Sequence, residues 1–166
     1  MSMTSGNGGG KIRILIADDH EMVLDVFAMY LSSASDMEVT TGKTLEEALE
    51  HITASGPFDV VLLDLDGEDG TESLTELHGH TKGRILVLTR SHDASLHDQA
   101  ILAGARGVLG KWERPNTLLK AIARVSEGEM WIDRDATSRI FMELARKKAA
   151  RATDPVQQRI SSLTRR

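Results

Sequence analysis

Carboxylates follow directly after two apolar segments of this sequence. The run Val-Val-Leu-Leu leads into Asp64, and Asp66 comes two positions later. A second apolar run leads into the pair Asp18 and Asp19. Short apolar runs with β-branched members predict strands that are buried on both faces. Ligands of open α/β sheets bind at the carboxyl ends of the strands, so these carboxylates are candidates for a functional site.

Two other polar residues stand at the ends of apolar runs. Thr89 follows the run Ile-Leu-Val-Leu, and Lys111 comes shortly after the run that begins at Gly107. Taken alone, Lys111 is a common surface residue and Thr89 indicates nothing. Their position at strand ends, where the carboxylates also fall, makes the pattern specific.

These residue types together favour phosphoryl transfer to a carboxylate. Asp18, Asp19 and Asp64 would raise one another's pKa values unless a cation lay among them. Mg²⁺ suits such an oxygen site, because it prefers one or two carboxylates together with phosphate oxygens and water. A dianionic phosphoryl group would then bind the metal, the Lys111 ammonium and the Thr89 hydroxyl. Asp64 is the predicted nucleophile.

Strands and helices alternate along the chain in a way that would position these residues. The predicted strands are 12–17, 37–41, 60–63, 85–88 and 107–109. Helices are predicted near 23–31, 44–53, 72–78, 94–103 and 118–128, with a further helix over 133–152. Thr44 and Glu47 form a capping-box pattern, and Gly104 is a natural left-handed cap. The alternation predicts an α/β fold with a doubly wound parallel sheet and an extra C-terminal helix.

The composition excludes several other classes of protein. The 166 residues contain no cysteine, which argues against a disulfide scaffold. Their formal net charge is −5, which argues against a nucleic-acid surface. No apolar run approaches membrane-spanning length, and the first ten residues predict disorder rather than a signal peptide. We therefore expect a cytoplasmic protein without a membrane partner. Beyond Arg139 basic residues outnumber acidic ones.

At this point the sequence resembles the receiver domains of two-component response regulators, in particular their NarL/LuxR branch. The resemblance covers about residues 11–133. It rests on Ile16-Ala17-Asp18-Asp19-His20, on Asp64, on Thr89, on Gly104-Ala105-Arg106-Gly107 with Lys111, and on Glu127-Gly128-Glu129. The tail Leu163-Thr164-Arg165-Arg166 looks like the opening of a LuxR-type helix-turn-helix.

The resemblance implies a flavodoxin-like five-stranded sheet with strand order 2-1-3-4-5. It implies four segments: a disordered extension over 1–10, a receiver domain over 11–132, a linker helix over 133–153, and the start of a truncated helix-turn-helix over 154–166. Such a chain would be part of a transcription regulator, and DNA would be bound only through the missing C-terminal domain.

The resemblance also implies a role for each site residue. Asp64 would accept phosphate from a sensor histidine kinase. Thr89 and Lys111 would bind the phosphoryl oxygens. The Mg²⁺ ligands would be Asp18, Asp19, Asp64 and the backbone carbonyl of Asp66. The chain would catalyse only its own phosphorylation, and the phosphorylated form would be a homodimer.

The sequence departs from the family pattern at three places. The loop after Asp64 is about two residues short, Arg90 stands where a small residue is usual, and Val108 takes the place of a switching aromatic residue. One alternative is therefore a receiver-like module that binds partners without taking phosphate.

A second alternative is a phosphatase similar to the haloacid dehalogenases, with Asp64 as nucleophile and Asp66 as general acid. That family places its metal-binding acidic pair after the lysine, whereas here Asp18 and Asp19 precede every other motif. The order of the motifs favours the receiver domain.

Overall fold

A computed structural model describes residues 10–66 and 70–153 of the chain. These residues fall into two compact units, which divide between Ile132 and Asp133.

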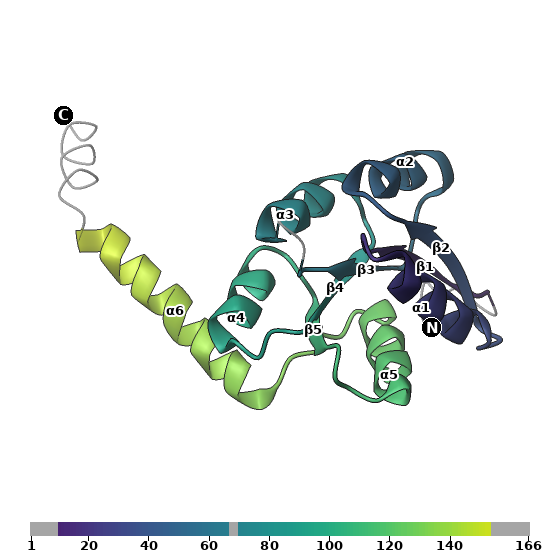
Figure 1. The fold of residues 1–166 in the computed structure, drawn as a ribbon. Coiled ribbons are helices and arrows are strands. Elements are labelled where there is room, and N and C mark those ends of the chain that lie inside the picture. The colour runs from purple at the N-terminus through teal and green to yellow at the C-terminus, as the bar shows by residue number, and fades with distance from the viewer. Residues whose placement is uncertain (1–9, 67–69, 154–166) are drawn as a thin grey trace, which may run out of the picture. The chain divides into compact units, whose positions relative to one another are not determined.

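The first unit is built on a parallel sheet of five strands (Figure 1). The strands are β1 (Ile12–Ala17), β2 (Met37–Gly42), β3 (Val60–Asp64), β4 (Arg84–Thr89) and β5 (Gly107–Gly110). Their spatial order is β2-β1-β3-β4-β5, which confirms the predicted flavodoxin-like topology. The order reverses at β1, so β1 and β3 lie side by side with their carboxyl ends at the same edge. Open α/β sheets bind ligands at this switch point.

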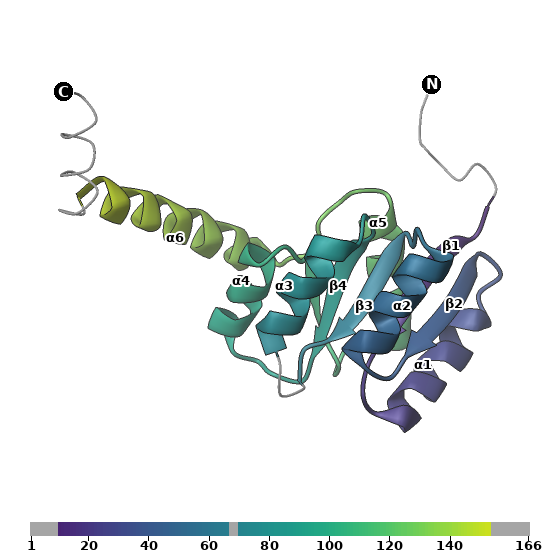
Figure 2. The ribbon, with the colours of Figure 1, turned by 90° about the horizontal axis from the view of Figure 1, so that it is seen from above.

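Five helices cover the two faces of the sheet. They are α1 (Glu21–Ser32), α2 (Leu45–Ser55), α3 (Gly70–His80), α4 (Ala94–Leu102) and α5 (Pro115–Ser126). Helices α1 and α5 pack on one face, and α2, α3 and α4 on the other (Figures 1 and 2). The sheet is therefore shielded on both faces, as the near-continuous apolar strands require.

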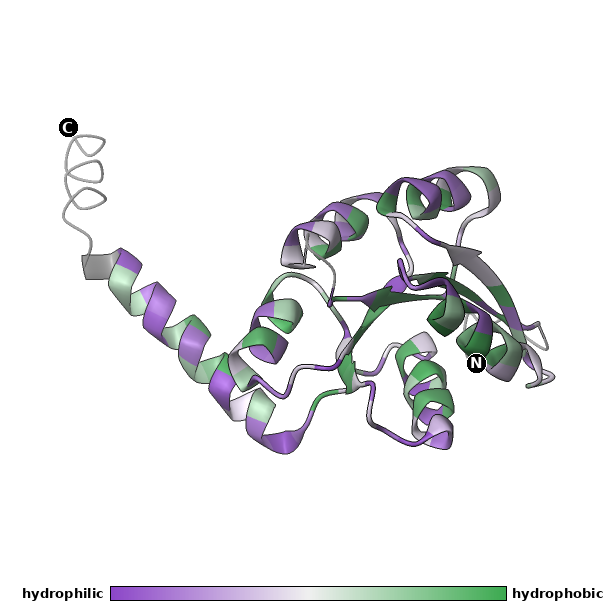
Figure 3. Ribbon diagram, in the orientation of Figure 1, coloured by the Kyte–Doolittle hydropathy of each residue, from purple (hydrophilic) through white to green (hydrophobic). Residues whose placement is uncertain are grey.

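The core consists of two layers that the strands separate. Along β1, Ile14 and Ile16 belong to the layer with α1 and α5, while Leu15 belongs to the layer with α2, α3 and α4. Adjacent side chains of a strand point to opposite faces, so one strand supplies both layers. The central strands are largely apolar, whereas apolar and polar residues alternate along the helices (Figure 3). Burial of each large aliphatic side chain contributes about 1.5–3 kcal/mol to the stability of the fold. The strands are therefore held rigidly, and so are their ends.

The local signals at the helix ends are confirmed, with one difference. The Thr44 hydroxyl accepts a hydrogen bond from the Glu47 backbone N–H at 3.1 Å and so caps α2. The Glu47 carboxylate, however, accepts from the backbone N–H of Lys43 at 2.6 Å, one residue earlier than a capping box has it. Gly104 has a positive φ of +117°, as expected of a glycine that ends α4.

The buried face of α1 cannot be inferred from the positions of its apolar residues. Val26 is 63% exposed, while Leu24 is buried. Apolar residues occur all around this helix, so helical spacing alone does not decide which of them face the sheet.

The second unit contains helix α6 (Arg134–Thr153), which confirms the predicted C-terminal helix. The Asp133 carboxylate accepts a hydrogen bond from the Ala136 backbone N–H at 2.6 Å and caps its first turn. None of the described helices has both the length and the apolar character needed to cross a membrane. The disordered extension predicted over 1–10 lies almost wholly outside the described residues, and the helix-turn-helix start predicted over 154–166 lies wholly outside them.

Candidate functional site

The parallel register brings the predicted site residues to one edge of the sheet. Asp64 ends β3 and pairs with Leu88 of β4, and Thr89 in turn pairs with Gly110, the residue before Lys111. The Asp64 side chain is only 3% exposed. A carboxylate at the end of a buried strand is held rigidly, and little water competes for its oxygens.

Lys111 is the cation at the centre of this edge. Its Nζ lies 2.7 Å from Asp64 Oδ1, 3.0 Å from Asp66 Oδ2 and 3.9 Å from Asp18 Oδ2. Burial lowers the pKa of Lys111, but the bonds to Asp64 and Asp66 outweigh burial and raise the pKa above its ordinary value. The lysine therefore stays charged and offers a fixed positive group at the end of β5.

Asp18 is a buried carboxylate with incomplete hydrogen bonding. Its Oδ1 accepts from the His20 backbone N–H at 2.9 Å, but its Oδ2 has no hydrogen-bond donor. Burial, together with the charge of Asp64, raises the pKa of Asp18, and the hydrogen bond from His20 opposes this only in part. A buried carboxylate oxygen without a donor fits a site that binds a cation.

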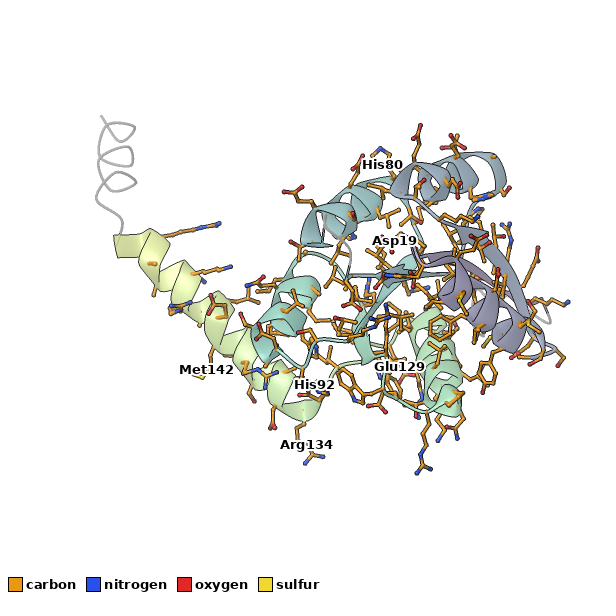
Figure 4. All side chains as sticks on the ribbon, in the orientation of Figure 1. Asp19, His80, His92, Glu129, Arg134 and Met142 are labelled. Carbon is orange, nitrogen blue, oxygen red and sulfur yellow. The ribbon has the colours of Figure 1, made fainter. Side chains whose placement is uncertain are left out.

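The imidazole of His20 joins the acidic residues. Its Nδ1 lies 2.9 Å from Asp19 Oδ1, 3.1 Å from Asp18 Oδ1 and 3.6 Å from Asp64 Oδ2. One ligand atom from each of Asp18, Asp19, His20 and Asp64 lies within 4.8 Å of the others. Three carboxylates at this separation, with the orphaned Asp18 Oδ2 among them, fit a hard divalent cation such as Mg²⁺. Asp19 is labelled in Figure 4.

The side chain of Asp66 accepts hydrogen bonds from neighbouring residues of the site, a role that the sequence did not predict. Its Oδ1 accepts from the Thr89 hydroxyl at 2.7 Å, and both of its oxygens accept from the Arg90 backbone N–H, at 3.1 and 3.0 Å. Burial raises the pKa of Asp66, but these bonds and the one from Lys111 lower it more, so the carboxyl is a stable anion. The carbonyl of Asp66 remains a predicted metal ligand.

A cavity of about 240 Å³ lies beside the acidic cluster. Asp18, Asp19 and Asp64 line it, and Lys43 and Ser73 are among the residues that complete the lining. Lys43 forms an ion pair of 2.9 Å with Glu21, which raises the pKa of the lysine. The cavity gives a small anionic group room to reach Asp64.

Sequence reasoning located the strand-end residues but missed two side chains. His20 belonged to the quoted motif without a role, although it directly follows two carboxylates. Asp66 lies two positions after Asp64, and residues at this spacing share one face of an extended segment. That alternation was the available signal for the Asp66 side chain.

The fold and the site together define a receiver-type α/β domain with an acidic edge and one central lysine. Residues 14–123 match the model of the response regulator receiver domain, and the chain therefore belongs to this family. Members are phosphoacceptors of two-component systems rather than classical enzymes, and the family assignment decides against the phosphatase alternative.

Several named proteins are similar to this chain. The oxygen regulatory protein NreC of Staphylococcus aureus is 34% identical over 154 residues, which are 87% of this chain and 70% of that protein. The receiver domain of the response regulator NarL from Mycobacterium tuberculosis is 28% identical, with a TM-score of 0.63 over 72% of this chain and 99% of that one. A LuxR-family DNA-binding response regulator from Silicibacter pomeroyi is also 28% identical, with a TM-score of 0.65 over 74% and 98%.

Proposed function

We propose that Asp64 is the phosphoacceptor of this receiver domain and that it takes the phosphoryl group from a phosphohistidine of a sensor kinase. The observation that carries the proposal is the position of the Asp64 carboxylate. It is buried at the end of β3, 2.7 Å from Lys111, and it belongs to the acidic cluster that contains the orphaned oxygen of Asp18. Receiver domains of response regulators interact with histidine kinases, which makes such a kinase the expected donor.

The residues present can support this transfer. An Asp64 oxygen attacks phosphorus while the P–N bond of the phosphohistidine breaks, and the imidazole nitrogen keeps the electron pair and takes a proton from solvent. Lys111 and the Thr89 hydroxyl then bind oxygens of the transferred group. This is positioning and charge stabilisation, the usual contribution of a protein to phosphoryl transfer.

Receiver domains generally bind Mg²⁺ at an acidic pocket. Here Asp18, Asp19, Asp64 and the Asp66 carbonyl would hold the ion, which would neutralise charge between the carboxylates and the incoming phosphoryl oxygens. His20 would remain beside the ion as a neighbouring donor or ligand.

The output of phosphorylation is proposed by analogy with the LuxR-type relatives. A phosphorylated domain would self-associate as a homodimer, and DNA binding by the regulator would respond to this association. Action in the cytoplasm remains a prediction.

Intact mass measurement after incubation with a small phosphodonor tests the assignment. We expect one Mg²⁺-dependent, alkali-labile phosphoryl adduct on the wild-type chain and none on Asp64→Asn. Absence of an adduct on the wild type would favour the module that binds partners without taking phosphate. The Asp66 contacts to Thr89 and Lys111 are the observation that keeps this second candidate open.

The same samples test residual phosphatase activity. Steady hydrolysis of an aryl phosphate that is lost in Asp66→Asn would contradict the phosphoacceptor role, because a receiver keeps its adduct long enough to be observed.

A further inference from the structure

The carboxylate of Asp66 already binds the groups that we assign to the phosphoryl oxygens. The Thr89 hydroxyl donates to Oδ1 at 2.7 Å, and Lys111 Nζ lies 3.0 Å from Oδ2. The Arg90 backbone N–H adds a donor that both oxygens share. Each oxygen of this carboxylate is thus held by a side-chain donor and a backbone donor, and the side chain is only 19% exposed.

Two of these donors, the Thr89 hydroxyl and the Arg90 amide, cannot serve two anions at once, whereas Lys111 has three hydrogens to share. A threonine hydroxyl has one hydrogen to donate, and the Arg90 amide has one as well. While Thr89 donates to Asp66, no hydrogen remains for a phosphoryl oxygen on Asp64. A phosphoryl group with nearly two negative charges would also repel the Asp66 carboxylate across the shared Lys111.

We propose that Asp66 is an internal ligand of the phosphoryl-binding site, which its carboxylate occupies before phosphorylation and leaves when Asp64 is phosphorylated. The inference rests on the proposed function of Asp64. It adds that the Asp66 carboxylate competes with the phosphoryl group on Asp64 for the same donors. Asp66 is here a positioning residue: it holds Thr89 and Lys111 in place through direct bonds and is displaced by the group that they receive.

The backbone of Asp66 allows this exchange. Its N–H donates to Asp64 Oδ1 at 3.0 Å and does not depend on where the side chain points. The residue as a whole is exposed, and rotation about the Cα–Cβ bond would take the carboxylate off Thr89 and Lys111 without breaking this backbone bond. The exchange therefore needs a side-chain movement and no rebuilding of β3.

A purely structural role for Asp66 predicts the opposite result. If the carboxylate only held the turn after β4 in shape, its removal would loosen Thr89 and weaken the binding of a phosphoryl group. If it competes for the site, its removal strengthens that binding. The sign of the effect separates the two roles.

The experiment is a titration of the full chain with beryllofluoride, a phosphoryl mimic, in the presence of Mg²⁺. We expect Asp66→Ala to bind the mimic about tenfold more tightly than the wild type, because the mimic no longer has to displace the charge-assisted hydrogen bonds of the Asp66 carboxylate. Asp66→Asn should bind more tightly as well. The control is Glu113→Gln, which removes one negative charge from an exposed residue of the loop after β5 and should stay within about twofold of the wild type.

A second readout needs no phosphoryl mimic. In the wild type the Arg90 amide donates to a carboxylate, so its NMR resonance should move clearly in Asp66→Ala and stay in place in Glu113→Gln. Equal or weaker beryllofluoride binding by a folded Asp66→Ala, or an unmoved Arg90 amide, overturns the inference. A third outcome is that neither the wild type nor any variant binds the mimic, while the Arg90 amide resonance still moves in Asp66→Ala. In that case the proposed phosphoacceptor role of Asp64 is wrong, and the occupancy of the site by the Asp66 carboxylate stands.

Discussion

At the scale of single residues, Asp18 shows a conflict between stability and function. Its Oδ2 is the one buried side-chain oxygen or nitrogen without a hydrogen-bond partner in the described part of the chain. Its pKa is raised by burial and by the neighbouring charge of Asp64, so ionisation of Asp18 destabilises the metal-free fold. A cation in the cluster would remove this cost, and the same residue would then contribute to function.

Asp18→Asn tests this conflict. We expect the variant to be more stable than the metal-free wild type by about 1 kcal/mol, because a neutral amide replaces a buried, poorly paired charge. Mg²⁺ should raise the melting temperature of the wild type and leave that of Asp18→Asn nearly unchanged. Asp19→Asn is the matched control, since a side chain that is 62% exposed should change metal-free stability little.

The pH dependence of the same comparison follows from the raised pKa of Asp18. A carboxyl with a raised folded-state pKa costs no stability below its unfolded value of 3.8, and the full cost is present above its folded value. The stability advantage of Asp18→Asn should therefore shrink as the pH falls toward 4. An advantage that is constant or grows with acidity would contradict the assignment of the cost to Asp18.

Positions of single residues were predictable, but several of their partners were not. Apolar runs that end on Asp18, Asp64 and Thr89 indicate strand ends, and strand ends of a parallel sheet converge. The bonds from Thr89 and Arg90 to Asp66 depend on the conformation of two loops, which apolar periodicity does not encode.

At the scale of elements, the turn between α4 and β5 depends on glycine. Gly104 has φ +117°, outside the left-handed helical region that other residues can adopt, whereas Gly70 has φ +43° and lies close to that region. A Cβ at Gly104 would also approach the ring of His78, but that side chain is exposed and can move aside. Backbone strain is thus the main cost of substitution.

We expect Gly104→Ala to reduce the free energy of unfolding by about 2 kcal/mol and Gly70→Ala to reduce it by less. Gly79→Ala is the control: Gly79 lies in α3 with open space where a Cβ would be added, so the substitution should stabilise the protein by about 0.5–1 kcal/mol. Urea unfolding of the three variants measures the differences. A cost at Gly70 as large as that at Gly104 would show that the backbone angle does not control the effect.

Elements differ in how far the sequence determines them. Strands β1, β3 and β4 were predictable because each contains a run of apolar residues, and α2 because Thr44 caps it. The buried face of α1 was not, since Met22, Val26 and Met29 are apolar yet exposed. Which apolar residues of this helix reach the sheet is decided by its packing and not by its own sequence.

At the scale of the whole molecule, the loop after β4 connects the site with the surface. Residues 90–93 follow Thr89 directly and lead into α4. His92 in this loop (labelled in Figure 4) stacks on Trp112 of the loop after β5, with ring centroids 3.8 Å apart. A change of hydrogen-bond partner at Thr89 would thus affect two loops at the same edge of the sheet.

We expect this route to control self-association of the domain. Thr89 would exchange Asp66 for the phosphoryl group, and the loop to α4 would follow, whereas the half-buried Val108 is too short and too restricted at χ1 to act as a switch. Sedimentation velocity with and without beryllofluoride should show association of the wild type and none of Asp64→Asn. Thr89→Ala should bind the mimic but associate more weakly, and Val108→Ala should lose some packing energy yet associate like the wild type. If Thr89→Ala associates normally while Val108→Ala does not, the signal runs through β5 and the proposed route through the loop after β4 is wrong.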